Sequence, residues 1–474
     1  MNTTRETALR LLVVGYYFMK TRSAGGHRLF AMIKYLSRQG WRATVLTTER
    51  GFRESGEVDG STVSRYVSAE TRVIPTGSLE LGWMWGNAPE RKLGRDALSG
   101  ESRARGRAGQ GDRRNERLCV LWKVPARWVR TVLNFPDRRV GWFFPLLFHS
   151  WRLLRQENFH VVLTSGPPHS CHLPFIILKR VFHFVWVCDY RDPWTDPPMY
   201  ASNKTTLSTS RILLFLNRLL ERSVLRNCDR VLANTPGNGE ALTRTFGNLV
   251  QGKLVVLTNG FDEEITPARG GLDDAALDCD FVFTGHTYLW MLDVYLEALK
   301  YMRDTGQRLP KLHVFGAPHD EVVANVRANG LSDQVLFMGS VSYEESLWLL
   351  NNAKALLLLF VARHEVFAHS VPSKLYAYLF SRRPYLALVP DGNAADILDR
   401  VGGGMRIRSS EPPQVADGIT SFLESVRAGG FKSERDRQTL EEYSWAALSA
   451  RLDSVLRSDV HRLGTPSNQR SGQI

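Results

Sequence analysis

At 474 residues the chain is too long for one ordinary core, so two domains are expected. Hydrophobic residues make up 43% of it and charged residues 23%, proportions that exclude a disordered chain. The formal net charge of +13 favours an anionic partner: a nucleotide, a phospholipid surface or nucleic acid. The five cysteines form no CxxC pair, which argues against a zinc site or a disulfide framework and fits a reducing cytoplasm.

The first half alternates strands and helices, a pattern typical of a parallel sheet covered by helices. Strands are expected at 10–15, 42–47, 63–75, 159–164, 184–188, 229–233 and 254–258. Gly25 and Gly26 stand just before a helix predicted over 27–39, where a glycine pair lets backbone approach an anion. A plain turn is the alternative, and the GxGxxG fingerprint of dinucleotide-binding folds is absent.

Two segments of the first half suggest contacts outside the sheet. Residues 103–117 are basic and glycine-rich and predict a mobile insertion at about 98–117, followed by a helix at 118–133. Nucleic-acid binding is disfavoured there because no aromatic residues are interleaved. Residues 141–151 lack formal charge and are rich in aromatics, so they fit either a membrane interface or a core helix. No run of about 18 uncharged apolar residues predicts a spanning helix.

Polar residues follow two consecutive strands of the first half. The strand at 159–164 leads into SGPPHS, and the strand at 184–188 leads into DYRDPW. Ligand sites in open parallel sheets form at the carboxyl ends of strands. Asp189, Arg191 and Asp192 are therefore expected to face a ligand cleft, with a purely structural Arg–Asp pair as the alternative.

Residues 263–278 are polar and contain Pro and Gly, so they predict an interdomain linker. Beyond them the alternation restarts, and each half is expected to form a doubly wound sheet of about six strands. The predicted units are an N-terminal domain, a C-terminal domain, a last helix that could cross back to the first domain, and a disordered tail, at 1–262, 279–440, 441–460 and 461–474.

The chain is organised around residues 361–390. They are predicted to form a loop, a helix, a tight turn and a strand, and they follow a buried strand predicted at 355–360. Pro372 suits a first helical turn, and Ser370 or Ser373 could cap the helix predicted at 373–380. With Lys374 beside them, free N–H groups there would make a phosphate seat. An ordinary turn between helix and strands is the alternative reading.

The order of these short motifs resembles the family 4 glycosyltransferases, closest to the bacterial polysaccharide branch with a strand ending in RDPW. The resemblance covers 11–456 and rests on AGG, SGPPHS, DYRDPW, NGFD, TGHTY, FMGSVSYEE, PSKLYAYL and RRPYLALVP. It implies the GT-B fold, in which two Rossmann-like domains face each other across a cleft, with the acceptor in the first and a nucleotide-sugar in the second. It also implies a retaining, metal-independent reaction. The DxD match at 278–280 precedes a strand and is interpreted as chance.

The resemblance also implies roles for individual residues. Arg191 and Asp192, with Asp189 beside them, lie where relatives act near the reacting sugar, and His169 and Ser170 lie on the acceptor side. Asn259 and Gly260 match the hinge. The donor-side positions are Gly25, Gly26, Gly285, His286, His369, Ser370, Ser373 and Lys374. A leaving nucleoside diphosphate gains negative charge, which N–H groups and cations at this place would stabilise.

Two features depart from the family pattern. The paired glutamates that relatives often carry are replaced by His369 and Ala377. The usual basic pair after the first strand of the second domain is missing as well, because residues 284–297 offer only His286. Lys374 could take over part of the diphosphate role.

The sequence thus predicts a cytoplasmic enzyme that moves a sugar from a nucleotide-sugar to a glycan or lipid-linked acceptor in surface polysaccharide biosynthesis. Peripheral contact with the inner membrane face is expected, and neither a metal cofactor nor nucleic acid is. The alternative, motivated by the missing glutamates, is a weak or inactive homologue that acts as a scaffold in a polysaccharide-assembly complex.

Overall fold

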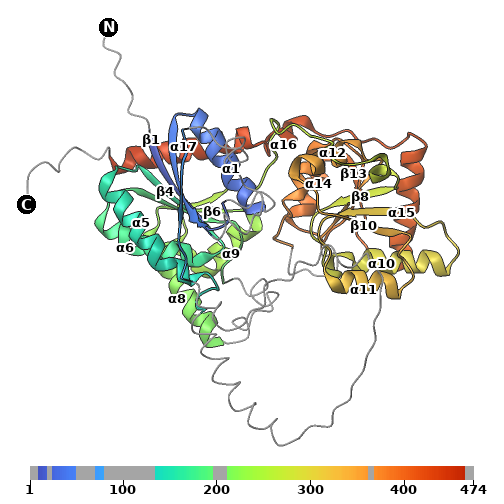
Figure 1. The fold of residues 1–474 in the computed structure, drawn as a ribbon, viewed down its shortest axis with the longest axis horizontal. Helices are drawn as coiled ribbons and strands as arrows, with labels where there is room; N and C mark the ends of the chain where they lie inside the picture. The colour runs from blue at the N-terminus through green and yellow to red at the C-terminus, as the bar shows by residue number, and fades with distance from the viewer. Residues whose placement is uncertain are drawn as a thin grey trace, which may run out of the picture.

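The computed structural model describes residues 9–18, 24–49, 70–79, 134–195, 211–360 and 368–464. The predicted insertion at 98–117 and the predicted helix at 118–133 lie outside these ranges, as does most of the predicted tail. Two lobes lie side by side (Figure 1), each built on one parallel sheet. The predicted pair of doubly wound sheets is confirmed.

The N-terminal sheet has seven strands in the order β3-β2-β1-β4-β5-β6-β7, all paired in parallel. Its strands are β1 Leu9–Gly15, β2 Trp41–Thr48, β3 Arg72–Thr76, β4 Val161–Gly166, β5 Val185–Tyr190, β6 Arg230–Ala233 and β7 Leu254–Val256. The inner strands are apolar runs buried on both faces, as parallel strands under helices must be. The strand order reverses between β1 and β4, where open α/β sheets place their ligands.

Helices cover both faces of this sheet. One face packs against α1 (Ala24–Arg38) and α17 (Trp445–Leu463). The other packs against α5 (Phe143–Gln156), α6 (Leu173–Val181) and α8 (Arg211–Asn227). The other helices that the structure describes in this lobe are η2 Val140–Trp142, η3 His169–His172, α9 Pro236–Phe246 and η4 Gly247–Leu249.

The C-terminal sheet has six parallel strands in the order β10-β9-β8-β11-β12-β13. Its strands are β8 Phe281–Thr284, β9 Leu312–Phe315, β10 Val335–Gly339, β11 Leu356–Leu359, β12 Tyr385–Leu388 and β13 Gly404–Arg406. Its helices are η5 Asp274–Leu277, α10 Leu289–Asp304, α11 Asp320–Ala328, α12 Tyr343–Asn352, α13 Lys374–Phe380, α14 Asn393–Val401, α15 Pro412–Arg427 and α16 Arg437–Glu441.

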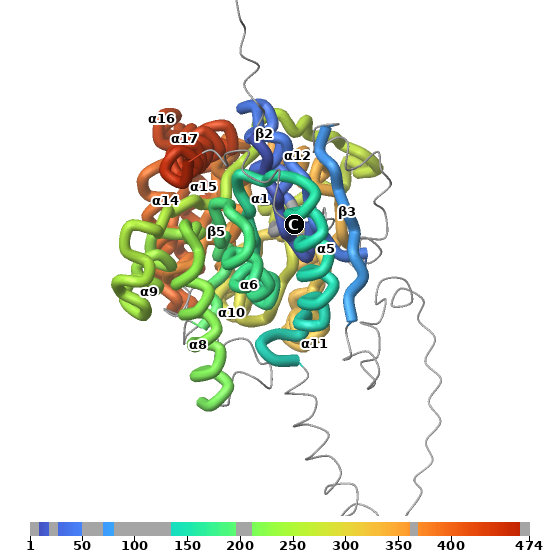
Figure 2. The backbone as a smooth tube through the Cα atoms, turned by 90° about the vertical axis from the view of Figure 1, so that its left-hand side faces the viewer, coloured from blue at the N-terminus to red at the C-terminus, as the bar shows by residue number. Residues whose placement is uncertain are grey.

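The chain crosses between the lobes twice. Beyond β7 it runs into the C-terminal lobe, and after α16 it returns as α17, which lies along the N-terminal lobe (Figures 1 and 2). The two crossings are bonded to each other, because Phe261 N donates to Tyr443 O and Trp445 N donates to Phe261 O. The two crossings therefore lie side by side as a hydrogen-bonded pair, and we call them the hinge.

Two local predictions are wrong, those for the start of α1 and for the start of the tail, and one of the two serines named as possible caps of α13 does not cap it. Helix α1 begins at Ala24, so Gly25 and Gly26 lie inside its first turn, not in front of it. Ser373 is the N-cap residue of α13, but its side chain makes no capping hydrogen bond. Helix α17 extends to Leu463, so the first residues of the predicted disordered tail are helical.

Candidate functional site

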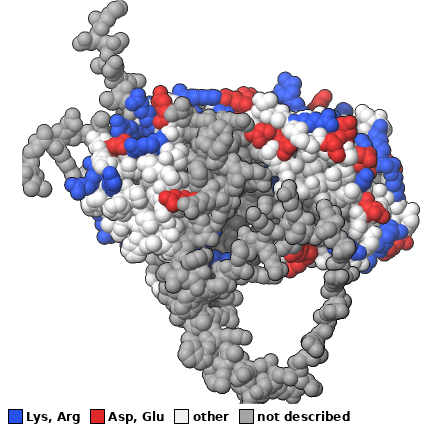
Figure 3. Space-filling model, viewed as in Figure 1, with Lys and Arg blue, Asp and Glu red and all other residues white. Residues whose placement is uncertain are grey.

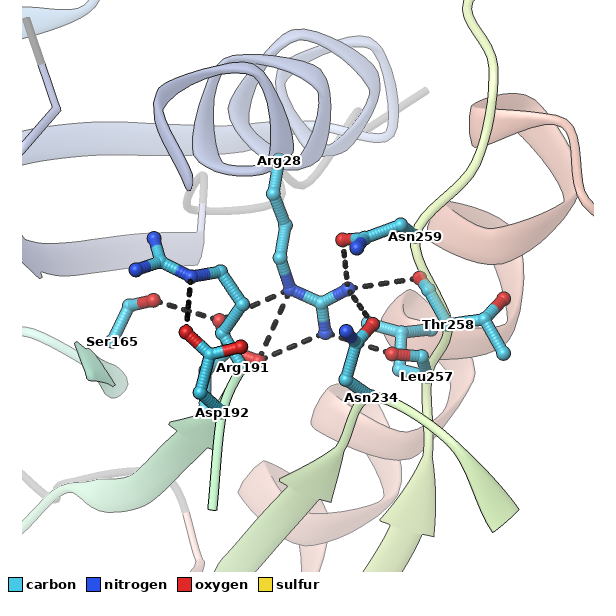
Figure 4. Close-up of polar contacts among 9 residues, drawn as sticks. Arg28, Ser165, Arg191, Asp192, Asn234, Leu257, Thr258 and Asn259 are labelled. Atoms are coloured by element: carbon cyan, nitrogen blue, oxygen red, sulfur yellow. Dashed lines mark hydrogen bonds and ion pairs between the residues drawn. The ribbon is translucent and has the colours of Figure 1, made fainter. Parts of the chain in front are cut away.

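A fully buried ion pair lies where α1 meets the carboxyl end of β5 (Figure 4). Arg28 Nη2 donates to Asp189 Oδ1 over 2.8 Å, and neither side chain is exposed. Ser165, which is paired with Asp189 in the β4–β5 register, donates its hydroxyl to Asp189 Oδ2 over 2.8 Å. Both carboxylate oxygens are thus occupied. This placement differs from the expectation that Asp189 faces a ligand cleft.

Arg28 uses its other N–H groups to hold the hinge. Nη2 and Nη1 donate to the backbone oxygens of Leu257 and Thr258, each over 2.8 Å. Nη1 also reaches Asn259 Oδ1 at 3.2 Å and Asn234 Oδ1 at 3.4 Å. One guanidinium therefore joins α1, β5, the end of β6 and the hinge, with its charge paired and its donors satisfied.

Sequence reasoning missed Arg28. The only signal was a basic residue two positions after the glycine pair, on the helix face that is otherwise apolar. That signal becomes informative only once the helix is known to begin at Ala24, which turns Arg28 towards the sheet.

Arg191 and Asp192 form the ion pair that the structural alternative anticipated, with 3.6 Å between Arg191 Nε and Asp192 Oδ2. The Arg191 side chain is 15% exposed, whereas that of Asp192 is 43% exposed. The backbone N–H of Arg191 donates to Gly166 O, which ties the loop after β5 to the end of β4. Asp192 is therefore a half-exposed carboxylate, held by this loop at the carboxyl edge of the sheet.

The predicted acceptor-side residues are packed into the wall of this edge. Ser170 donates both its N–H and its hydroxyl to Asp137, over 2.8 and 2.9 Å. The His169 ring stacks on Trp194 with 5.1 Å between ring centroids, and burial lowers the pKa of His169. Gly166 makes room for this packing, because a Cβ there would lie 2.6 Å from His169 Nδ1. The His169 ring is neutral and nearly covered.

The C-terminal lobe contributes a buried amine at the carboxyl end of β8. Lys374 is half-buried as a residue, and its Nζ is buried 3.8 Å from the Phe283 ring centroid. Nζ has no hydrogen-bond partner among the described residues, and burial lowers the pKa of Lys374 to about 7. Gly285, at a φ of +117°, leaves the amine its room, because a Cβ there would come within 2.9 Å of Nζ.

The other predicted donor-side residues differ in how exposed they are. His286 follows Gly285 and is exposed, whereas His369, Ser370 and Ser373 are half-buried. Ala377, which stands where relatives carry a glutamate, is buried in the core of the lobe.

The two lobes touch next to the predicted donor residues. Thr235 Oγ1 donates to His369 O over 2.6 Å, and Gly237 N donates to Asn393 Oδ1 over 2.9 Å. A Cβ on Gly237 would collide with the His369 ring and lie 2.8 Å from Asn393 Oδ1. The start of α9 therefore contacts the C-terminal lobe through a residue that must be small.

The Gly237→Ala variant should weaken this contact, because its methyl group cannot enter without moving His369 or separating the lobes. We expect a larger radius of gyration in small-angle scattering and weaker binding of a nucleoside diphosphate. The matched control is Gly77→Ala, in the same lobe, where a Cβ would meet nothing within 4 Å and the backbone is not in the left-handed region. An unchanged scattering curve and unchanged affinity for Gly237→Ala would show that the contact does not hold the lobes together.

Comparisons with known proteins agree with this architecture. Residues 105–265 match the family model described as Glycosyltransferase Family 4. Sucrose-phosphate synthase from Thermosynechococcus elongatus is similar at 12% identity and TM-score 0.60, over 96% of this chain and 100% of that one. Anabaena Alr3699/HepE in complex with UDP-glucose is similar at 11% identity and TM-score 0.58, over 95% and 100%. No curated protein matches the chain.

Two parallel sheets with interleaved helices, matched over nearly the whole chain by these structures, define a two-domain GT-B fold. The match of residues 105–265 to Glycosyltransferase Family 4 agrees with the predicted family and with a glycosyltransferase. The predicted fold is confirmed.

Proposed function

We propose that this glycosyltransferase moves a sugar from a nucleotide-sugar to a glycan or lipid-linked acceptor in surface polysaccharide biosynthesis. In this proposal the anomeric configuration is retained, no metal takes part, and the protein works in the cytoplasm at the inner membrane face. The proposal rests on Lys374 Nζ, which is buried at the carboxyl end of β8 and has no hydrogen-bond partner within the part of the chain that the structure describes.

A buried amine without a counter-ion is unfavourable, and an anion placed beside it relieves that cost. A diphosphate seated at Gly285 would meet backbone at close range and Lys374 Nζ directly. As the sugar–phosphate bond breaks, the leaving diphosphate gains charge, and Lys374 would stabilise it most in the transition state. The UDP-glucose in the Anabaena Alr3699/HepE structure supports a nucleotide-sugar as the donor class.

Asp192 is the proposed carboxylate of the N-terminal lobe near the reacting sugar, with Arg191 as its positioning partner. Its half-exposed oxygens at the carboxyl edge can accept a hydrogen bond from a sugar hydroxyl. Asp189 is left out of this role because Arg28 and Ser165 occupy its oxygens.

Replacing Asp192 by asparagine should lower kcat by about ten- to a hundredfold, because a hydrogen bond from the sugar to a charged carboxylate is worth about 1.5–3 kcal/mol. Nucleoside diphosphate affinity should change little, since Lys374 lies in the other lobe. A transfer assay checks kcat and calorimetry checks affinity, with the exposed Asp304→Asn as control. Unchanged kcat would place the reacting sugar elsewhere.

The scaffold alternative rests on His369 and Ala377, which replace the carboxylates of relatives. Calorimetric titration with UDP and GDP separates the two proposals. Micromolar binding of either nucleotide, together with donor hydrolysis or transfer, supports the enzyme. Absence of binding by both nucleotides, and of turnover with a panel of nucleotide-sugars, would favour the scaffold.

A further inference from the structure

Helix α5 has a buried side and an apolar exposed side. Trp142, just before it, is buried and donates its indole N–H to Thr76 Oγ1 over 2.7 Å, and Leu146 is also buried. Phe144 and Phe148, four residues apart, are 68% and 63% exposed, and Trp151 continues the same side. Residues 141–151 therefore have one side that packs in the core, as the core-helix alternative expects, and one side that is apolar and exposed.

Helix α8 repeats this pattern. Leu213, Asn217, Glu221 and Val224 are buried, whereas Ile212 and Phe215 are 68% and 61% exposed. Leu216 and Leu219 are exposed on the same side. Between α8 and α5 lies α6, with Ile177 and Val181 exposed, and the Trp151 ring contacts that of Phe182 at 5.2 Å.

The three helices lie side by side (Figures 1 and 2), and the surface over α5 and α6 is largely uncharged in Figure 3. They carry nine of the fourteen exposed large hydrophobic side chains found among the described residues. Such clustering, unlike single scattered residues, marks an interaction surface. We call it the apolar face; its members are Phe144, Phe148, Trp151, Ile177, Val181, Ile212, Phe215, Leu216 and Leu219.

The charges on these helices have one sign. Glu221 is their only acidic residue, and it is buried against Thr195. Their basic residues are Arg152, Arg155, Lys179, Arg180, Arg211, Arg218, Arg222 and Arg226. An apolar face surrounded by arginines matches the boundary between the acyl chains and the headgroups of an anionic bilayer. A second copy of the chain would bring like charges together, which disfavours a symmetric dimer through this face.

We propose that α5, α6 and α8 dock the protein onto an anionic phospholipid membrane. Within the described residues no helix is long and apolar enough to span one, so the contact lies in the interface plane. Exposed aromatic rings would enter the headgroup region, and the arginines would meet lipid phosphates.

The inner side of α8 links this face to the loop that carries Asp192. Asn217 Oδ1 accepts from the indole N–H of Trp194 over 3.1 Å, and Glu221 accepts from the Thr195 hydroxyl. The residues directly after Asp192 are thus fixed to a helix whose outer side meets lipid. This step, which rests on the proposed function, would let a lipid-linked acceptor remain in the bilayer while its glycan reaches Asp192.

The test is vesicle flotation of the full chain. We compare vesicles of phosphatidylcholine that contain about 30 mol% of the anionic lipid phosphatidylglycerol with vesicles of pure phosphatidylcholine. We expect binding to the anionic vesicles only, weakened by salt. Changing Arg152, Arg155 and Arg222 together to glutamine should weaken binding to the anionic vesicles about a hundredfold, because each arginine contributes about fivefold. Phe148→Ser with Phe215→Ser should also release the protein.

Matched controls make the same kinds of substitution at exposed residues outside α5, α6 and α8. The charge control changes Arg308, Arg408 and Arg462, whose side chains are 70–74% exposed, to glutamine. The apolar control changes Met338 and Leu463, both exposed, to serine. Binding lost equally in the controls would overturn the proposal, as would equal binding to pure phosphatidylcholine.

Two further readouts separate other outcomes. If light scattering shows a dimer that Phe148→Ser with Phe215→Ser dissociates, the apolar face is an interface between copies and the membrane proposal fails. Nucleotide binding and donor hydrolysis in solution are expected to be the same in the face variants as in the wild type. If a face variant loses membrane binding but keeps nucleotide binding, the change concerns this inference alone. If it keeps membrane binding but loses nucleotide binding, the change concerns the proposed function alone.

Discussion

Lys374→Met should make the protein more stable and unable to bind a nucleoside diphosphate. Burial lowers the pKa of Lys374 from 10.5 to about 7, which corresponds to about 5 kcal/mol at full effect. We expect a gain in the free energy of unfolding on the order of 3 kcal/mol at pH 7, less than the full effect because Lys374 as a whole is only half-buried. Methionine fills similar space without an amine to bury.

The pH dependence has a definite sign. The unfolded chain protonates Lys374 below pH 10.5, whereas the folded chain does so only below about pH 7. The advantage of the variant is therefore full below pH 7 and shrinks as the pH rises towards 10.5. Urea midpoints at pH 7 and pH 9 measure this difference.

The exposed Lys354→Met serves as the control, with little change expected in either property. Wild-type affinity of Lys374→Met for UDP and GDP would remove Lys374 from the donor site. A less stable Lys374→Met variant would mean that Nζ has a favourable partner in the folded protein. Gain of stability with loss of binding is the pattern expected where a site is built at the expense of stability.

Arg28→Met should have the largest destabilising effect. It leaves the Asp189 carboxylate buried and without a charge partner, a change that typically costs about 3–5 kcal/mol. It also removes donors from the backbone oxygens of Leu257 and Thr258 at the hinge. Urea unfolding of the N-terminal lobe, followed by circular dichroism, measures the loss.

A second substitution tests the cause. Asp189→Asn added to Arg28→Met removes the stranded charge, so the double variant should be more stable than Arg28→Met alone. Arg38→Met is the control on the same helix, because its ion pair with Glu264 is about half exposed and contributes less than about 1 kcal/mol. Equal losses for Arg28→Met and Arg38→Met would show that burial of the pair does not matter.

Much of the fold could be predicted because buried parallel strands are short apolar runs between turn residues. The runs at 355–360 and 385–388 appear as β11 and β12, with α13 between them one residue shorter than expected. The start of α1 could not be predicted, because a glycine pair favours a turn over a helix in isolation and tertiary packing decides.

The site was harder to predict than the fold. Sequence position alone could place Asp189 and Asp192 at one sheet edge, but not their different burial. That difference depends on Arg28, which comes from a helix 161 positions away. Likewise, the Lys374 pKa depends on the Phe283 ring and the bare backbone of Gly285, neither of which is near it in sequence.

The return of α17 has a consequence for how the chain is made. Leu448, Leu452 and Leu456 of this helix complete one side of the N-terminal core, yet they leave the ribosome only after the whole C-terminal sheet. That lobe must therefore wait, with an uncovered apolar side, until the second domain has been translated. Chaperone demand during synthesis should consequently arise from the N-terminal domain, and a truncation that removes α17 should damage that domain although the helix is far from it in sequence.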